Sequence, residues 1–269
     1  MKTRIISAAV LVLVLFVVVL AAPEIVAALV LGVLLAVAAY ELLYRTGLVK
    51  RTRLVLYSCA MAFAISMWSY LGAIRAYFLL MLMVFFVLLF AEMMMDHVKV
   101  RFEMLGMCFV AGVIIPYMLS SLIRILMLPI GRAVILAPFV AAYMSDAGAY
   151  FVGLKFGKHK LAPVVSPNKT IEGLVGGIVS AVLGMLVYAL ILAVLKYHVS
   201  FGMALLYGLA GSLAGTFGDL CFSIIKRQTG IKDYGNLIPG HGGALDRFDS
   251  LTMVAPLMEA LLILVPLVS

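Results

Sequence analysis

Carboxylates, a hydroxyl and cations that could bind phosphate gather between positions 215 and 250 of an otherwise apolar sequence. Asp219, Ser223 and Arg227 follow one another at intervals of four, so a helix would place them on one face. Lys226 adds a second cation beside them. The segment continues with further residues that could contact a substrate or an ion: Lys232, Asp233, His241, Gly242, Gly243, Asp246, Arg247 and Asp249. Because paired glycines allow positive φ and a close backbone approach, this composition predicts a site for a phosphate-bearing ligand.

Mg²⁺ is the metal ion that suits these carboxylates. It binds through one or two carboxylates together with substrate phosphates and water, and Asp219 and Asp246 are the natural pair. Lysines and arginines alone would indicate a patch for anionic lipids. Carboxylates, glycines and a histidine among them favour phosphoryl or nucleotidyl transfer instead. The sequence contains no G-x-x-x-x-G-K-[ST] segment, which excludes a P-loop nucleotide site.

For some acidic and basic residues, two of them upstream of this segment, a purely structural role is an alternative to substrate binding. Asp146 interrupts an apolar stretch, and a carboxylate at membrane depth normally faces a watery cavity or the interior of a bundle. It could bind substrate or join two helices by a hydrogen bond. Lys169 lies just before an expected helix start at Thr170, where free N–H groups favour an anion, but it could also be a solvated lysine. Asp249 could contact substrate or cap a helix together with Ser250, and capping is also an alternative for Asp246.

The composition places this chemistry in a membrane. Of 269 residues, 66% are apolar and 12% charged, against about 45–50% and about 25% in ordinary soluble domains. A soluble enzyme is therefore excluded, and we expect an all-α, polytopic membrane protein. A spanning helix needs roughly 20 mostly apolar residues. Nine stretches qualify: 5–22, 25–43, 54–72, 76–95, 103–128, 133–154, 172–195, 203–225 and 250–268. The first is long for a signal peptide, so we expect it to be retained.

The distribution of cations predicts the orientation. The tail and loops on one side hold 16 of the 20 lysines and arginines, and cytoplasmic loops carry such an excess. The N-terminus is therefore expected in the cytoplasm and the C-terminus outside. Residues 1–130 are expected to form a transmembrane scaffold. Residues 131–269 are expected to form the catalytic region, with cytoplasmic loops at 155–172 and 226–249.

Residues 223–249 form a long sequence signature. Residues 223–249 match, at every specified position, the pattern S-x-x-K-R-x4-K-D-x-[GSA]-x2-[LIF]-[PG]-x-H-G-G-x-x-D-R-x-D. On these residues the sequence resembles the phosphatidate cytidylyltransferase (CDP-diacylglycerol synthase) family. The upstream segments SDAGAY, SPNKTIEG and GDL look like other blocks that this family shares. The resemblance covers the C-terminal half closely, and the N-terminal half only in the number and character of its helices.

The resemblance implies an enzyme of the cytoplasmic (inner) membrane in which CTP and phosphatidic acid give CDP-diacylglycerol and pyrophosphate. It implies a Mg²⁺ requirement, with the number of metal ions open, and a homodimer in the bilayer. The cation distribution predicts that the loops of the active site face the cytoplasm, and no nucleic-acid partner is expected. Asp219 and Asp246 would bind the metal ion. Phosphate groups would be held by Lys169, Lys226, Arg227 and His241. The other substrate-binding candidates are Asp146, Ser223, Lys232, Asp233, Gly242, Gly243, Arg247 and Asp249.

Other classes of protein remain open at this point. A polyprenol or dolichol kinase, or a cytidylyltransferase for isoprenoid ether lipids, would share the metal and nucleotide chemistry. A transporter or cation channel could also use membrane-buried acids such as Asp146 and Asp219, but transporters often contain internal repeats and none is found here. A lipid-binding scaffold without catalysis is a third class. Release of pyrophosphate from CTP only with phosphatidate would separate the enzyme from the last two.

Overall fold

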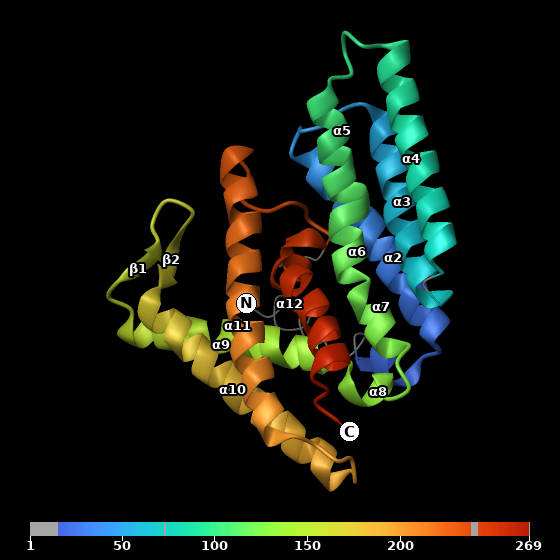
Figure 1. Cartoon of the computed structure of the whole chain (residues 1–269). Coiled ribbons are helices and arrows are strands. Elements are labelled where there is room, and N and C mark those ends of the chain that lie inside the picture. The colour runs from blue at the N-terminus through green and yellow to red at the C-terminus, as the bar shows by residue number, and fades with distance from the viewer. Residues whose placement is uncertain (1–15, 73, 238–241, 269) are drawn as a thin grey trace. The chain divides into compact units, whose positions relative to one another are not determined.

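The computed structural model describes residues 16–72, 74–237 and 242–268, and these are almost entirely α-helical (Figure 1). The contacts divide the chain into two compact units. The first unit comprises Met1–Pro129 and Gln228–Phe248, and the second comprises Ile130–Arg227 and Asp249–Ser269. The signature residues Gln228–Phe248 therefore belong to the same unit as the N-terminal helices.

The first unit is a bundle of apolar helices. Its elements in chain order are η1 (Val17–Ala21), α2 (Glu24–Tyr40), η2 (Glu41–Arg45), α3 (Thr52–Tyr70), α4 (Arg75–Met95), α5 (Phe102–Phe109), η3 (Val110–Ile114), α6 (Ile115–Leu119) and α7 (Ser121–Leu126). Gly32 lets α2 approach α3, since a Cβ there would lie 2.8 Å from the Phe63 ring. The Ser66 hydroxyl joins the same two helices by donating to the Ala28 carbonyl at 2.8 Å. Small residues and a satisfied hydroxyl are typical of helix packing in membranes.

The second unit contains longer helices and one hairpin. Its elements are α8 (Gly131–Val134), α9 (Ala137–Phe156), β1 (Lys160–Ala162), β2 (Ser166–Thr170), α10 (Ile171–Val194), α11 (Phe201–Gln228) and α12 (Leu245–Leu264), with the division between the units falling inside α12 after Phe248. Helices α9 and α10 pack closely because glycines face larger side chains: a Cβ at Gly148 would overlap Ser180, and one at Gly176 would overlap Val152.

The antiparallel hairpin β1–β2 precedes α10 (Figure 1). Lys160 pairs with Thr170, and Ala162 pairs with Ser166. The sequence predicts only a loop over 155–172, so these strands are an addition. The expected helix start at Thr170 is confirmed, because the Thr170 hydroxyl accepts the Gly173 N–H at 3.1 Å and so satisfies one of the free donors of the first turn.

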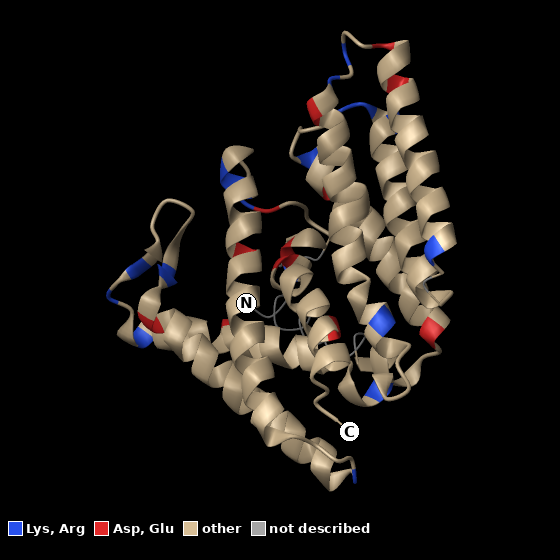
Figure 2. Ribbon diagram, viewed as in Figure 1, with Lys and Arg blue, Asp and Glu red and all other residues tan. Residues whose placement is uncertain are grey.

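Among the described residues, six helical stretches are long and apolar enough to cross a membrane. They are Glu24–Arg45, Arg75–Met95, Phe102–Leu126, Gly131–Phe156, Ile171–Val194 and Phe201–Gln228. Most of the expected first span, 5–22, lies outside the described residues. The helical class is confirmed except for the β1–β2 hairpin, and the six candidate spans support a multi-pass protein. The count of nine spans and the orientation stay predictions. Figure 2 shows that charged residues fall mainly near helix ends and in connecting segments, with one acidic exception within α11.

Candidate active site

Asp219 lies at the centre of a polar cluster on α11. One carboxylate oxygen, Oδ2, lies 2.7 Å from Nζ of Lys169 on β2, with both side chains about one-quarter exposed. The other oxygen, Oδ1, accepts a hydrogen bond from the Ser223 hydroxyl at 3.1 Å, one helical turn further along α11. The shared face predicted for Asp219 and Ser223 is confirmed. The structure also joins the SPNKTIEG segment to the GDL segment through a direct ion pair.

Two more carboxylates approach this cluster from other helices of the same unit. Burial, together with the neighbouring Asp219 charge, raises the pKa of Asp249 on α12 to about 7, while Lys226 opposes the shift. Asp146 on α9 also contributes to this repulsion. The Ser250 hydroxyl donates to Oδ2 of Asp146 at 3.5 Å, a long hydrogen bond. Three acids and two lysines therefore influence one another here.

The capping alternative for Asp249 is wrong. Helix α12 begins at Leu245, so Asp249 lies inside the helix beyond its first turn. The Ser250 backbone N–H does lie 2.8 Å from Oδ1 of Asp249, but this contact is not at the helix terminus. The two alternatives for Asp146 both remain, since its side chain is exposed and also contacts Ser250.

Arg227 ties the hairpin to the end of α11. Its Nε donates to the carbonyl of Val165, in the turn between β1 and β2, at 3.1 Å. Because Lys169 lies on β2, this bond helps to hold the lysine over Asp219. The side chain of Arg227 is exposed, so its guanidinium is open to solvent on this side of the cluster.

Asp246 has a different environment, in the first unit. Its side chain is 7% exposed, and Oδ2 accepts backbone N–H groups from Tyr234 at 2.8 Å and from Gly243 at 3.0 Å. Gly242 has a φ of +85°, a conformation that favours glycine, and a Cβ there would lie 2.9 Å from the Asp246 carboxylate. The positive φ predicted for the glycine pair is thus confirmed at Gly242. The close approach of this backbone to a ligand stays a prediction, and in the structure Gly242 lies against Asp246.

Sequence reasoning missed Glu41, which the structure places against the same segment. Oε1 of Glu41 accepts the Ala244 N–H at 3.2 Å, and Oε2 accepts the Leu245 N–H at 2.9 Å. The available signal was an acidic residue inside an apolar run, AVAAYELLYR, in the half taken as scaffold.

The remaining predicted residues are placed as follows. Lys232, Asp233 and Arg247 are exposed on the 228–248 segment. His241 lies outside the described residues. Over the described ranges, no group of three or more His, Cys, Asp or Glu side chains is arranged to hold a metal ion. Asp219 belongs to the second unit and Asp246 to the first, so their pairing on one ion stays a prediction.

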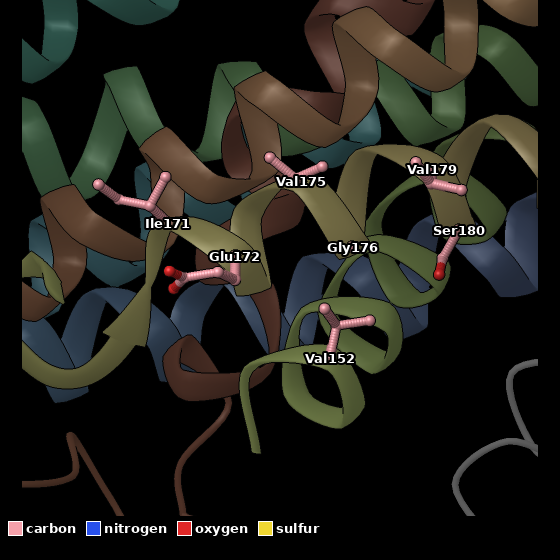
Figure 3. A pocket seen from close by; sticks show the side chains of 7 residues that line it. All are labelled: Val152, Ile171, Glu172, Val175, Gly176, Val179 and Ser180. Carbon is pink, nitrogen blue, oxygen red and sulfur yellow. The ribbon is translucent and has the colours of Figure 1, made fainter. Parts of the chain in front are cut away.

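An apolar groove runs between α9 and α10, with a volume of about 480 Å³ (Figure 3). Its lining consists of Val152, Ile171, Glu172, Val175, Gly176, Val179 and Ser180. The Glu172 carboxylate contacts the His159 ring at 2.6 Å and the Lys158 backbone N–H at 3.0 Å. Ile171, at one end of this lining, follows the cluster residue Lys169 by two positions in the sequence.

Comparison with known proteins agrees with this chemistry. Phosphatidate cytidylyltransferases of three staphylococci match the chain over 133 residues: 47% identity for Staphylococcus epidermidis, 45% for Staphylococcus aureus and 44% for Staphylococcus haemolyticus. The match covers 49% of this chain and 50% of each relative, so the chain spans about half the length of the curated relatives it matches. A model of the cytidylyltransferase family matches residues 2–265. The chain therefore belongs to the cytidylyltransferase family.

Proposed function

We propose that this protein transfers CMP from CTP to phosphatidate, giving CDP-diacylglycerol and pyrophosphate. The observation that carries the proposal is the cluster in which Lys169 pairs with Asp219 at 2.7 Å. It combines a carboxylate suited to a hard cation with lysines suited to phosphates. The name of the staphylococcal relatives supports the same reaction.

The chemistry needs positioning more than proton transfer. The second pKa of a phosphate monoester is about 6, so a phosphatidate oxygen is already ionised near neutral pH. That oxygen attacks the α-phosphorus of CTP in line. The bond from the α-phosphorus to the bridging oxygen breaks, and pyrophosphate leaves with the electron pair. Because two polyanions must meet, cations that neutralise charge supply most of the help.

We assign Mg²⁺ to Asp219 and Asp246. The donor set fits, since carboxylate oxygens are hard ligands and Asp219 is partly open to solvent. When bound, the ion would neutralise phosphate charge and polarise the phosphorus centre. Lys169 and Lys226 would hold phosphates, together with Arg227 and His241. A phosphate arriving beside Lys169 would compete with Asp219 for the ammonium and leave the carboxylate to the cation.

The lipid tail would occupy the groove between α9 and α10. Its apolar lining includes Ile171, two positions after Lys169 in the sequence, and this change from polar to apolar suits a phosphate with an acyl chain. We further propose a homodimer with nine spans, in a cytoplasmic membrane. The N-terminus and the active site would face the cytoplasm, where CTP is found. The cation distribution supports this orientation.

The test is a reconstitution with purified protein in detergent, CTP and Mg²⁺. With phosphatidate we expect equal amounts of pyrophosphate and a lipid that contains cytidine, and neither product when phosphatidate is omitted. Parallel reactions contain a polyprenol or an isoprenoid ether-lipid phosphate. A lipid that gains one phosphate and no cytidine would refute the proposal in favour of a kinase. Preference for the ether lipid would refute the assigned acceptor.

A matched pair of variants connects the reaction to the cluster. Lys169→Met removes the cation next to Asp219, whereas Lys160→Met removes an exposed cation from the neighbouring strand of the same hairpin. We expect at least a 100-fold loss of turnover for the first and less than a twofold change for the second. Equal effects would mean that only the general charge of the hairpin matters.

A further inference from the structure

We infer that Glu41, in the N-terminal half of the chain, positions the glycine-rich signature segment that carries Asp246. This inference rests on the proposed function. Glu41 is the first residue of η2, the π-helical turn that ends the α2 helix, and such turns often occur at functional sites. Its side chain is 3% exposed. Its two carboxylate oxygens accept N–H groups from residues more than 200 positions away, Ala244 and Leu245.

These two N–H groups belong to the start of α12, which begins at Leu245. The first N–H groups of a helix have no acceptor within the helix, and the partial positive charge at that end favours an anion. The Glu41 carboxylate meets both needs and therefore fixes where α12 begins. Asp246 is the next residue along this helix.

The glycines of the signature leave room for the Glu41 side chain. A Cβ at Gly235 would overlap Oε1 of Glu41 and lie 2.7 Å from its Cδ. A Cβ at Gly243 would overlap both carboxylate oxygens. Among the described glycines, positive φ occurs at Gly47, Gly72, Gly230 and Gly242. Gly235 and Gly243 are not among them, so left-handed backbone does not explain glycine at these two positions. Space for Glu41 accounts for glycine at both positions.

The Asp246 carboxylate is bonded to this same segment. It accepts the N–H groups of Gly243 and Tyr234, so its orientation depends on the backbone that Glu41 holds. Glu41 is therefore a positioning residue that acts through Asp246. Loss of its two hydrogen bonds should disturb the metal-binding carboxylate without removing any group that contacts substrate.

The first test uses Glu41→Gln, with Glu103→Gln as the matched control, since Glu103 is an exposed acid on α5 of the same unit. The amide in Glu41→Gln keeps the shape but replaces one acceptor with a donor aimed at an N–H group. We expect kcat to fall at least tenfold and the half-saturating Mg²⁺ concentration to rise at least fivefold. The KM for phosphatidate should stay within twofold, and the control variant should match the wild type.

A structural measurement on the same variants does not depend on turnover. Hydrogen exchange followed by mass spectrometry on peptides covering 242–248 should be at least tenfold faster in Glu41→Gln than in Glu103→Gln. Unchanged exchange would overturn the inference. Faster exchange with unchanged kcat and unchanged Mg²⁺ dependence would overturn the positioning role. Failure of the wild type to form CDP-diacylglycerol would overturn the proposed function instead, and exchange would still decide whether Glu41 holds the segment.

A second variant, Gly235→Ala, leaves Glu41 unchanged and so tests the contact even if Glu41→Gln does not fold. Gly235→Ala adds one methyl group against the Glu41 carboxylate and should reduce kcat at least fivefold. In a Glu41→Ala background the same methyl group finds open space, so adding it should change kcat less than twofold. Equal effects of Gly235→Ala in the two backgrounds would overturn the contact.

Discussion

The ion pair between Lys169 and Asp219 allows stability and catalysis to be measured separately. We compare the wild type with Lys169→Met, Asp219→Asn and the double variant. The atoms Nζ and Oδ2 are 2.7 Å apart, and the side chains are 24% and 27% exposed. Charges about 4 Å apart at an effective dielectric constant of about 20 interact by about 4 kcal/mol before desolvation and side-chain entropy. Exposed pairs contribute about 0.2–1 kcal/mol, whereas breaking a buried pair costs about 3–5 kcal/mol.

The partial exposure of this pair places its coupling between these limits, at about 1–2 kcal/mol. Each single variant should therefore lose that much free energy of unfolding, because one charge is left without its partner. The double variant should regain most of the loss. The assay is thermal unfolding in one detergent at one lipid concentration, where 1 kcal/mol corresponds to about 2–4 °C for a chain of this size.

Turnover should follow a different rule. Both single variants should lose at least 100-fold in kcat, which is about 2.7 kcal/mol of transition-state stabilisation. The double variant should stay inactive, because it has neither the carboxylate for Mg²⁺ nor the cation for phosphate. If the double variant recovered turnover to within tenfold of the wild type, the pair would be structural only, and the proposed roles of both residues would be wrong.

Three further outcomes follow from the described contacts and the sequence. Asp246→Asn should abolish turnover while the protein still folds. The amide oxygen can accept the Tyr234 and Gly243 N–H groups, but it lacks the charge that a hard cation needs. Near wild-type activity at saturating Mg²⁺ would contradict the metal assignment. Gly148→Ala should lower the free energy of unfolding by about 1–3 kcal/mol, because the added Cβ would overlap Ser180 across the packed α9 and α10 helices; an unchanged melting temperature in detergent would argue against that close packing. A reporter fused after Ser269 should report an extracytoplasmic location, given that 16 of the 20 lysines and arginines lie on the opposite side of the expected spans; a cytoplasmic signal would mean that the number of spans is wrong.

Local spacing made part of the candidate site predictable. Asp219 and Ser223 are four residues apart, so helix geometry alone places them on one face, and their 3.1 Å hydrogen bond follows. The start of α10 at Thr170 was predictable for the same reason, since capping involves only Thr170 and Gly173. The positive φ of Gly242 also follows from residue type and immediate neighbours.

Contacts between distant segments were not predictable from spacing. The ion pair of Lys169 with Asp219 joins positions 50 residues apart, although each residue was a candidate by itself. The β1–β2 hairpin is only three and five residues long and includes Pro167, which is unfavourable inside strands. Its turn is held from outside by Arg227. No local sequence pattern predicts such a hairpin.

The sequence also did not predict that residues 228–248 belong to the first unit. Hydropathy describes this segment as a polar loop between two apolar stretches. In the structure Tyr234, Ala244 and Leu245 are almost fully buried, and Glu41 supplies acceptors for the last two N–H groups. Burial of a loop against a partner 200 residues away depends on tertiary packing, which single-sequence periodicity does not contain.

The 27-residue signature reflects two different physical requirements: a common helix face and space for neighbouring side chains. The pattern of residue types does not distinguish the two. Its first residues, from Ser223 to Arg227, lie on the α11 helix, where a spacing of four residues places side chains on a common face. From Gln228 to Phe248 the chain belongs to the first unit, and there the glycines leave space for neighbouring side chains: Gly242 for Asp246, and Gly235 and Gly243 for Glu41. The surrounding protein therefore accounts for glycine at these positions, and a substrate contact at Gly242 or Gly243 stays a prediction. Loss of activity after a glycine substitution here would therefore not by itself identify a ligand contact. Glu41 lies outside the signature, but its side chain accounts for two of the signature's glycines.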